Sequence, residues 1–252
     1  MTYLFHHLTY LIVVFILIFF VLPFIRSFAA GPRKLRKKAK LISEYARQKG
    51  YRLANPSAAE AASSSSWREM LTNPSLRSFS KGSEGITDIE DLGRGTDDPF
   101  AVICSLRSKE VTIFDFSVSS QRADTSGGSV RYKVAKVRME GLPRFSLGRN
   151  SLVHTVEIAV DKLTGKPKSS VEVDPGKDSE FAKHYWLKGA DSGAVVAFLG
   201  PEKLRFLGNT KLAGVVATNA NYMVYSEYGA LSSAGDFDSF IATVENLVAH
   251  LL

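Results

Sequence analysis

An uncharged, strongly apolar stretch at the N-terminus constrains this chain more than any other feature of its sequence. Residues 1–25 contain no Asp, Glu, Lys or Arg, and residues 8–25 read LTYLIVVFILIFFVLPFI. Eighteen residues in a helix span about 27 Å, which is close to the thickness of the hydrocarbon core of a bilayer. Because lipid offers no partner for backbone N–H and C=O groups, a single stretch of this kind has to be helical. The pattern predicts a transmembrane anchor over residues 1–28.

Two other interpretations of this stretch are weaker. A cleaved signal peptide would use the small residues around Phe28, since Ser27-Phe28-Ala29 has the spacing of a cleavage site. The positive region that normally begins a signal peptide is missing, however, because residues 1–25 hold only His6 and His7 as ionisable side chains of basic type. A buried core helix is disfavoured by the length and evenness of the apolar run.

The flanking charges predict the orientation of the anchor. No Lys or Arg precedes the apolar run, whereas seven follow it between residues 26 and 40. The positive-inside rule therefore predicts a single-pass protein of the cell (inner) membrane. Its N-terminus is expected outside and its C-terminal domain in the cytoplasm. The single cysteine, Cys104, excludes an intrachain disulfide, so an oxidising compartment is not required.

Positive charge is concentrated in the first fifth of the chain. The whole chain has 32 Lys and Arg against 25 Asp and Glu, a net charge of +7. Residues 1–52 hold ten of the basic residues and one acid, Glu44, which leaves 22 basic and 24 acidic residues in positions 53–252. A mildly acidic folded part argues against nucleic-acid binding, which requires a basic face on the domain.

Residues 33–52 are predicted to form a helix, within a basic juxtamembrane segment over residues 29–54. Its apolar residues share one face at spacings of four, three and four, and Gly50 is expected to end it. This basic face either stays in solvent or lies along an anionic leaflet, where each Lys or Arg contributes about 1 kcal/mol, and the two interpretations are compatible. The residues expected to bind lipid headgroups are Arg33, Lys34, Arg36, Lys37, Lys38 and Lys40.

Residues 55–98 read as a flexible lead-in rich in Ala, Ser and Gly. An Ala/Ser run ends in four serines at residues 63–66, and glycines then punctuate the acidic sequence ITDIEDLGRGTDDP. Calcium loops need acids at alternate positions, a central Gly and a late Glu, and this order is absent here. We expect no metal site and no cofactor in this segment or elsewhere.

Residues 99–252 are predicted to form one α+β domain, a mainly antiparallel sheet packed by a C-terminal helix. The hairpin over residues 100–118 turns at Ser108-Lys109, and residues 130–139 alternate as a strand with one solvated face. A helix over residues 233–252 places seven apolar residues on one face. Those residues are Phe237, Phe240, Ile241, Val244, Leu247, Val248 and Leu251. Further strands are expected at residues 145–147, 152–160, 184–188, 215–218 and 221–225.

Several motifs resemble those of an uncharacterised family of bacterial single-pass membrane-anchored proteins with a cytoplasmic α+β domain. They are YARQKGY at residues 45–51, IFDF at 113–116, LPRFSL at 142–147, the segment 181–191 and the Pro-initiated helix 201–207. The resemblance covers most of residues 40–252 and implies a fold and a topology. Members often carry an acid soon after the Leu-Pro-x-Phe turn, where this chain has Gly148-Arg149-Asn150.

No catalytic signature is present in the sequence. It has no phosphate loop, no nucleophile elbow, no zinc-protease motif and no paired cysteines. His154, His184 and His250 occur singly and are expected to be ordinary packed or surface residues, and Cys104 an inert core thiol. Asp115 lies between two aromatics in a strand. Burial could disfavour its charged form, but we expect it to serve a turn or a neighbouring lysine.

Three classes of function follow, and an enzyme is not the favoured one. The favoured class is a membrane-tethered interaction module, whose partners are the bilayer, its anionic headgroups and a protein that the sequence does not identify. The alternatives are a membrane-tethered enzyme with a dispersed site and a structural or assembly factor at the membrane. Convergent acids with His154 or His184 would favour the enzyme, and an exposed apolar patch or sheet edge would favour the assembly factor.

Overall fold

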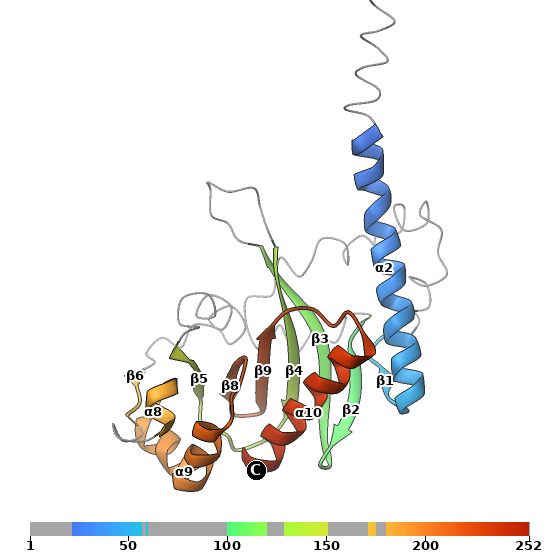
Figure 1. Cartoon of the computed structure of the whole chain (residues 1–252). Coiled ribbons are helices and arrows are strands. Elements are labelled where there is room, and N and C mark those ends of the chain that lie inside the picture. The colour runs from blue at the N-terminus through green and yellow to red at the C-terminus, as the bar shows by residue number, and fades with distance from the viewer. Residues whose placement is uncertain are drawn as a thin grey trace, which may run out of the picture.

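The described part of the chain is built on one large sheet with helices against it (Figure 1). The computed structural model describes residues 22–56, 59, 100–119, 129–150, 171–174 and 180–251. Its helices are α2 (Leu22–Lys49), α8 (Glu180–His184), α9 (Ser192–Asn209) and α10 (Ala234–Leu251). Its strands are β1 (Arg52–Leu53), β2 (Val102–Leu106), β3 (Lys109–Ser119), β4 (Ser129–Arg138), β5 (Phe145–Arg149), β6 (Val171–Glu172), β7 (Tyr185–Gly189), β8 (Val215–Asn219) and β9 (Tyr222–Tyr228).

The described strands form one sheet in which neighbours run antiparallel. Their order is β1-β2-β3-β4-β9-β8-β5-β7-β6, so β4 and β9 are neighbours although they lie far apart in the sequence. Helix α10 lies across one face of this sheet (Figure 1). The predicted α+β class, with an antiparallel sheet and a packed C-terminal helix, is confirmed.

The β2–β3 hairpin has the expected location but turns one residue earlier than predicted. Leu106 pairs with Lys109, which leaves Arg107 and Ser108 as the two turn residues. Both have positive φ, 51° and 64°, as a two-residue turn matched to the twist of the strands requires. The side chains of β3 alternate between the two faces of the sheet, with Ile113 and Phe114 buried in different apolar clusters.

Helix α10 buries the face predicted from its spacing. All seven residues of that face are buried, and Phe240 stacks on Tyr225 of β9 with ring centroids 5.6 Å apart. The start of α10 is capped because Asp236 N donates to Ser233 Oγ at 3.1 Å, while Ser232 N and Oγ donate to Asp236 Oδ2 at 3.0 and 2.6 Å. These hydrogen bonds lower the pKa of Asp236.

The second half of α2 is part of the domain core. Ala39, Ile42, Tyr45 and Ala46 are at most 2% exposed and belong to the same apolar cluster as the inner face of α10. The helix ends where predicted, at Gly50, whose φ of 69° suits glycine. Sequence reasoning placed this stripe in a juxtamembrane helix of its own. The stripe packs inward instead because the sheet and α10 offer it a complementary apolar surface.

Strand β4 differs from its prediction, because its side chains are buried on both faces. Tyr132 and Val134 lie in one apolar cluster, and Ala135 and Val137 lie in the other. Lys136 is only 6% exposed and its Nζ lies 3.8 Å from the ring centroid of Tyr222, a cation–π contact. Burial lowers the pKa of Lys136. The prediction of one solvated face is therefore wrong. A lysine can lie on an apolar surface because its long aliphatic stem packs there.

Helix α9 is two helical pieces joined at a kink. Asp191 caps its start by accepting a hydrogen bond from Ala194 N at 3.0 Å. Gly200 has a φ of 56°, and Pro201 begins the second piece, because proline fits the first turn of a helix. The last turn is closed by Thr210 N, which donates to the carbonyl oxygens of Phe206 and Leu207.

Much of the predicted N-terminal anchor lies outside the described residues. The structure describes its last part as the beginning of α2, but it does not describe residues 1–21. Among the residues it describes, no helix is both long and apolar enough to cross a bilayer. The strand predicted at 152–160 and most of the lead-in at 55–98 also fall outside the described part.

Candidate functional site

The most unusual polar feature of the described core centres on Asp115 of β3. Alternation along β3 places its carboxylate on the face that α2 and α10 cover, where its side chain is 5% exposed. Lys38 Nζ of α2 lies 2.7 Å from Asp115 Oδ2, and Leu231 N donates to Asp115 Oδ1 at 2.9 Å. The favoured sequence interpretation, in which Asp115 serves a neighbouring lysine, is confirmed.

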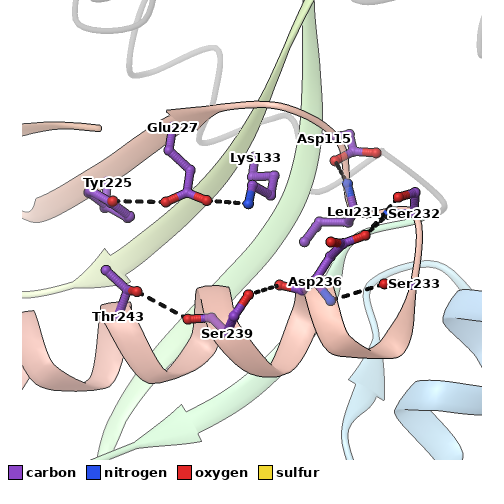
Figure 2. A network of polar contacts seen from close by, with 10 residues as sticks. All are labelled: Asp115, Lys133, Tyr225, Glu227, Leu231, Ser232, Ser233, Asp236, Ser239 and Thr243. Atoms are coloured by element: carbon purple, nitrogen blue, oxygen red, sulfur yellow. Dashed lines mark hydrogen bonds and ion pairs between the residues drawn. The ribbon is translucent and has the colours of Figure 1, made fainter. Parts of the chain in front are cut away.

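Asp115 begins a row of alternating charges that crosses three strands. Asp115 lies directly opposite Lys133 of β4, and Lys133 lies directly opposite Glu227 of β9. Lys133 Nζ and a carboxylate oxygen of Glu227 form an ion pair, in which each side chain is 13% exposed. Figure 2 shows this pair beside Asp115 and the capped start of α10. We call Lys38, Asp115, Lys133 and Glu227 the ionic row.

The ionic row is balanced in charge, although Asp115 Oδ2 is buried and its close contact with Lys38 Nζ lacks hydrogen-bond geometry. It contains two ammonium groups and two carboxylates, and Tyr225 OH adds a hydrogen bond to Glu227 Oε2 at 2.9 Å. Burial and the nearby Glu227 carboxylate raise the pKa of Tyr225. A buried ion pair is costly to break by removing one partner, because the other charge stays in a poorly solvated place. The Lys38–Asp115 pair therefore joins α2 to β3, the hydrogen bond from Leu231 N joins β3 to the segment before α10, and the Lys133–Glu227 pair joins β4 to β9.

A second polar contact joins α2 to α10 near the other end of the buried stripe. Tyr45 OH donates to Asp238 Oδ1 at 2.8 Å, and Lys49 Nζ lies 2.9 Å from the same oxygen. The hydrogen bonds from Lys49 and Tyr45 lower the pKa of Asp238, whereas burial, with Asp238 as a further cause, raises the pKa of Tyr45. Tyr45 also stacks on Phe237, with ring centroids 4.6 Å apart.

The basic residues expected to bind headgroups divide into two groups. Lys38 points into the domain and pairs with Asp115. Arg36, Lys37 and Lys40 are exposed, and Lys40 Nζ lies 3.8 Å from Glu44 Oε1. The side chains of the remaining two, Arg33 and Lys34, lie outside the described part. Lipid binding by these residues stays a prediction, and the structure adds that Lys38 has a different partner.

The other candidate residues that the structure describes are two exposed histidines and one buried thiol. His184 lies 3.8 Å from Glu180, and His250 stacks on Phe206 with ring centroids 3.9 Å apart. Burial raises the pKa of the Cys104 thiol to about 11. Within the described ranges, no group of three or more His, Cys, Asp or Glu residues could hold a metal ion. His6, His7, His154 and the acidic sequence before residue 100 lie outside those ranges.

Sequence reasoning identified one member of the ionic row and missed its arrangement. Asp115 was singled out because an acid between aromatics in a strand is unusual. Lys133 was instead placed on a solvated face, and Glu227 was not considered. The charge of Lys133 gave no usable signal, because β4 holds three further basic residues, Arg131, Lys136 and Arg138. Its pairing with Glu227 depends on β9 lying beside β4, which periodicity does not reveal.

Comparisons with known proteins give little further information. No family model matches the chain, and no curated protein matches it. Among solved structures, the crystal structure of the mycobacterial trehalose monomycolate transport factor A, TtfA, is 11% identical. Its TM-score is 0.47, and the match covers 85% of this chain and 94% of that one. The resemblance to a membrane-anchored bacterial family therefore stays a prediction.

Proposed function

We propose that this chain is a single-pass membrane-anchored protein whose α+β domain is an interaction module held in a set orientation at the cytoplasmic face of the membrane. The observation that carries the proposal is the continuity of α2. This helix begins at Leu22, inside the apolar stretch of the sequence, and its second half is buried in the domain core. Gly31-Pro32 lies inside α2, where the proline removes one backbone hydrogen bond, yet α2 runs as one helix from Leu22 to Lys49 (Figure 1), so it is proposed to transmit the direction of the anchor to the sheet.

The charges on α2 support a role at an anionic leaflet. Lys38 pairs with Asp115, while Arg36, Lys37 and Lys40 remain exposed, about 16–22 Å of helix beyond Ile25, the last residue of the apolar stretch. Each basic residue close to an anionic surface contributes about 1 kcal/mol. The apolar stretch alone would supply the anchoring, so these three residues are proposed to orient the domain rather than to retain it.

The topology is tested by a reporter fused after Leu252. We expect a reporter that works only in the cytoplasm to be active at this position, because the basic flank follows the apolar stretch. A reporter that requires export should be inactive there. Activity of the exported reporter would overturn the proposed location. Both reporters would also be fused to a variant in which Gln replaces the basic residues of the flank, and this would show whether charge sets the orientation.

The exposed basic residues are tested with vesicles and a fragment of residues 31–252, which retains the buried half of α2. Replacing Arg36, Lys37 and Lys40 by Gln should weaken binding to anionic vesicles at least about tenfold, because three favourable charges of about 1 kcal/mol each are lost. Replacing Arg138, Arg205 and Lys211, which are also exposed, removes the same charge elsewhere and should have a small effect. Failure of the parent fragment to bind at low salt would limit these charges to a role in insertion.

A further inference from the structure

Lys136 of β4 is a buried lysine that no carboxylate faces among the residues that the structure describes. It is 6% exposed, and burial is the cause that lowers the pKa of its ammonium group. The two lysines of the ionic row, Lys38 and Lys133, are more exposed, yet each lies against a carboxylate. A buried charge without a counter-ion destabilises a fold. The charge of Lys136 is therefore better explained by a group from outside the fold.

Arg138 brings a second positive charge to the same place. It lies two residues further along β4 and therefore on the same face of the sheet, where it pairs directly with Tyr222 of β9. Lys136 Nζ lies 3.8 Å from the ring centroid of Tyr222, so its ammonium group leans toward the level of Arg138. Thr112 of β3 pairs directly with Lys136 and adds a hydroxyl group on this face. Two positive charges and a hydroxyl group thus lie around one aromatic ring.

The surroundings of these side chains leave the site open at one edge. Glu110, the acid on this face of β3, lies 3.5 Å from Arg52 of β1. Arg138 is exposed and has no ion pair with a carboxylate of the described ranges. It is the last residue of β4, and the neighbouring β8–β9 turn is exposed at residues 220 and 221. Lys136 Nζ is not among the described polar atoms that are sealed from solvent without a partner, so a ligand can reach it from this rim.

We propose that Lys136 and Arg138 bind carboxylates of an acidic segment of a partner protein, with the Tyr222 ring beneath them. This rests on the proposed function, because it gives the interaction module a partner of defined chemistry. Phosphate sites commonly use free backbone N–H groups at helix starts and tight loops, whereas β4 is paired with strands on both sides. The donors that remain are side chains, an ammonium group and a planar guanidinium that can hold a carboxylate through two parallel hydrogen bonds.

The test measures binding of a hexaglutamate peptide to the full chain in a nonionic detergent at low salt, by isothermal titration calorimetry. A hexaglutamine peptide is the uncharged control, and inorganic phosphate is titrated separately. Lys136→Met and Arg138→Gln are compared with Lys211→Met and Arg205→Gln, which remove exposed positive charges elsewhere. Urea unfolding of each variant is followed on the same preparations, because a lysine that serves only the fold and one that serves a ligand differ in this measurement.

We expect Lys136→Met and Arg138→Gln each to weaken hexaglutamate binding at least about tenfold, because each removes a charge that contacts the ligand. The two control variants should change it less than about twofold. Lys136→Met should leave the urea midpoint unchanged or raise it, since it removes a buried charge and keeps the aliphatic stem. If that variant did not fold, Arg138→Gln, at an exposed position, would carry the binding test.

Three results would overturn the acidic partner. The first is unchanged hexaglutamate binding by Lys136→Met together with a lower urea midpoint, which would make Lys136 a residue of the fold alone. The second is equal weakening by the control variants, or no binding by the parent chain. The third is phosphate binding that is tighter than peptide binding and that Lys136→Met abolishes, which would make this a phosphate site. The reporter fused after Leu252 tests the location of the module independently of all three.

Discussion

Leu247→Asp is expected to abolish cooperative folding of the domain. Leu247 is fully buried between α10 and the sheet, so the substitution removes apolar packing and places an unpaired carboxylate in the core. The loss of packing alone costs about 2–5 kcal/mol, and the buried charge adds several more, against a typical total stability of about 5–15 kcal/mol. Thermal unfolding followed by circular dichroism should show no cooperative transition.

The matched control for this change is Ala242→Asp in the same helix. Ala242 is exposed, so the new carboxylate stays in water and only helix propensity is lost, at a cost below about 1 kcal/mol. Its unfolding curve should remain cooperative and close to that of the parent. If Leu247→Asp melted like Ala242→Asp, the face of α10 would not be buried and the architecture described above would be wrong.

Asp115→Asn is expected to destabilise the domain by about 2–4 kcal/mol, close to the range for removing one partner of a buried ion pair. The amide oxygen can still accept from Leu231 N, so the main loss is the partner of Lys38, whose side chain is 24% exposed. Urea unfolding should show a lower midpoint with an unchanged slope. The exposed Arg52–Glu110 pair, 3.5 Å apart, is the control, and Glu110→Gln should change stability by about 0.5 kcal/mol or less.

A double-mutant cycle separates the ion pair from other effects of the substitution. Lys38→Met keeps most of the aliphatic stem and removes the charge. If the pair is formed, the cost of Lys38→Met and Asp115→Asn together should be at least about 0.5 kcal/mol smaller than the sum of the two single costs. Additive costs would show that Lys38 and Asp115 do not interact, and would remove the ionic row's link to α2.

Local patterns in the sequence were sufficient for the elements that fold mainly on short-range rules. The apolar face of α10 follows directly from its helical spacing, and the β2–β3 hairpin follows from two apolar runs separated by a short turn. Gly50 marks the end of α2 through chemistry that is visible in the sequence, because glycine tolerates positive φ. These predictions required no knowledge of which elements are neighbours.

Features that depend on long-range neighbours were not predictable in the same way. The apolar stripe of α2 could equally have faced a leaflet, and only the presence of α10 and the sheet shows that Ile42 is buried. Lys133 looks solvated in isolation because a lysine in an alternating strand usually is. Its burial follows from the placement of Glu227 opposite it, which requires the order β4-β9 in the sheet.

The most direct test of the account is whether α2 is rigidly joined to the domain. Spin labels at Lys37→Cys, exposed on α2, and Ala220→Cys, exposed at the far end of the sheet, would report the distance between them in the full chain in proteoliposomes, with Cys104 replaced by Ala. The account predicts a single narrow distance distribution, which Asp115→Asn broadens. A broad distribution in the chain with Asp115 intact would show that α2 moves independently of the domain, and would contradict the account.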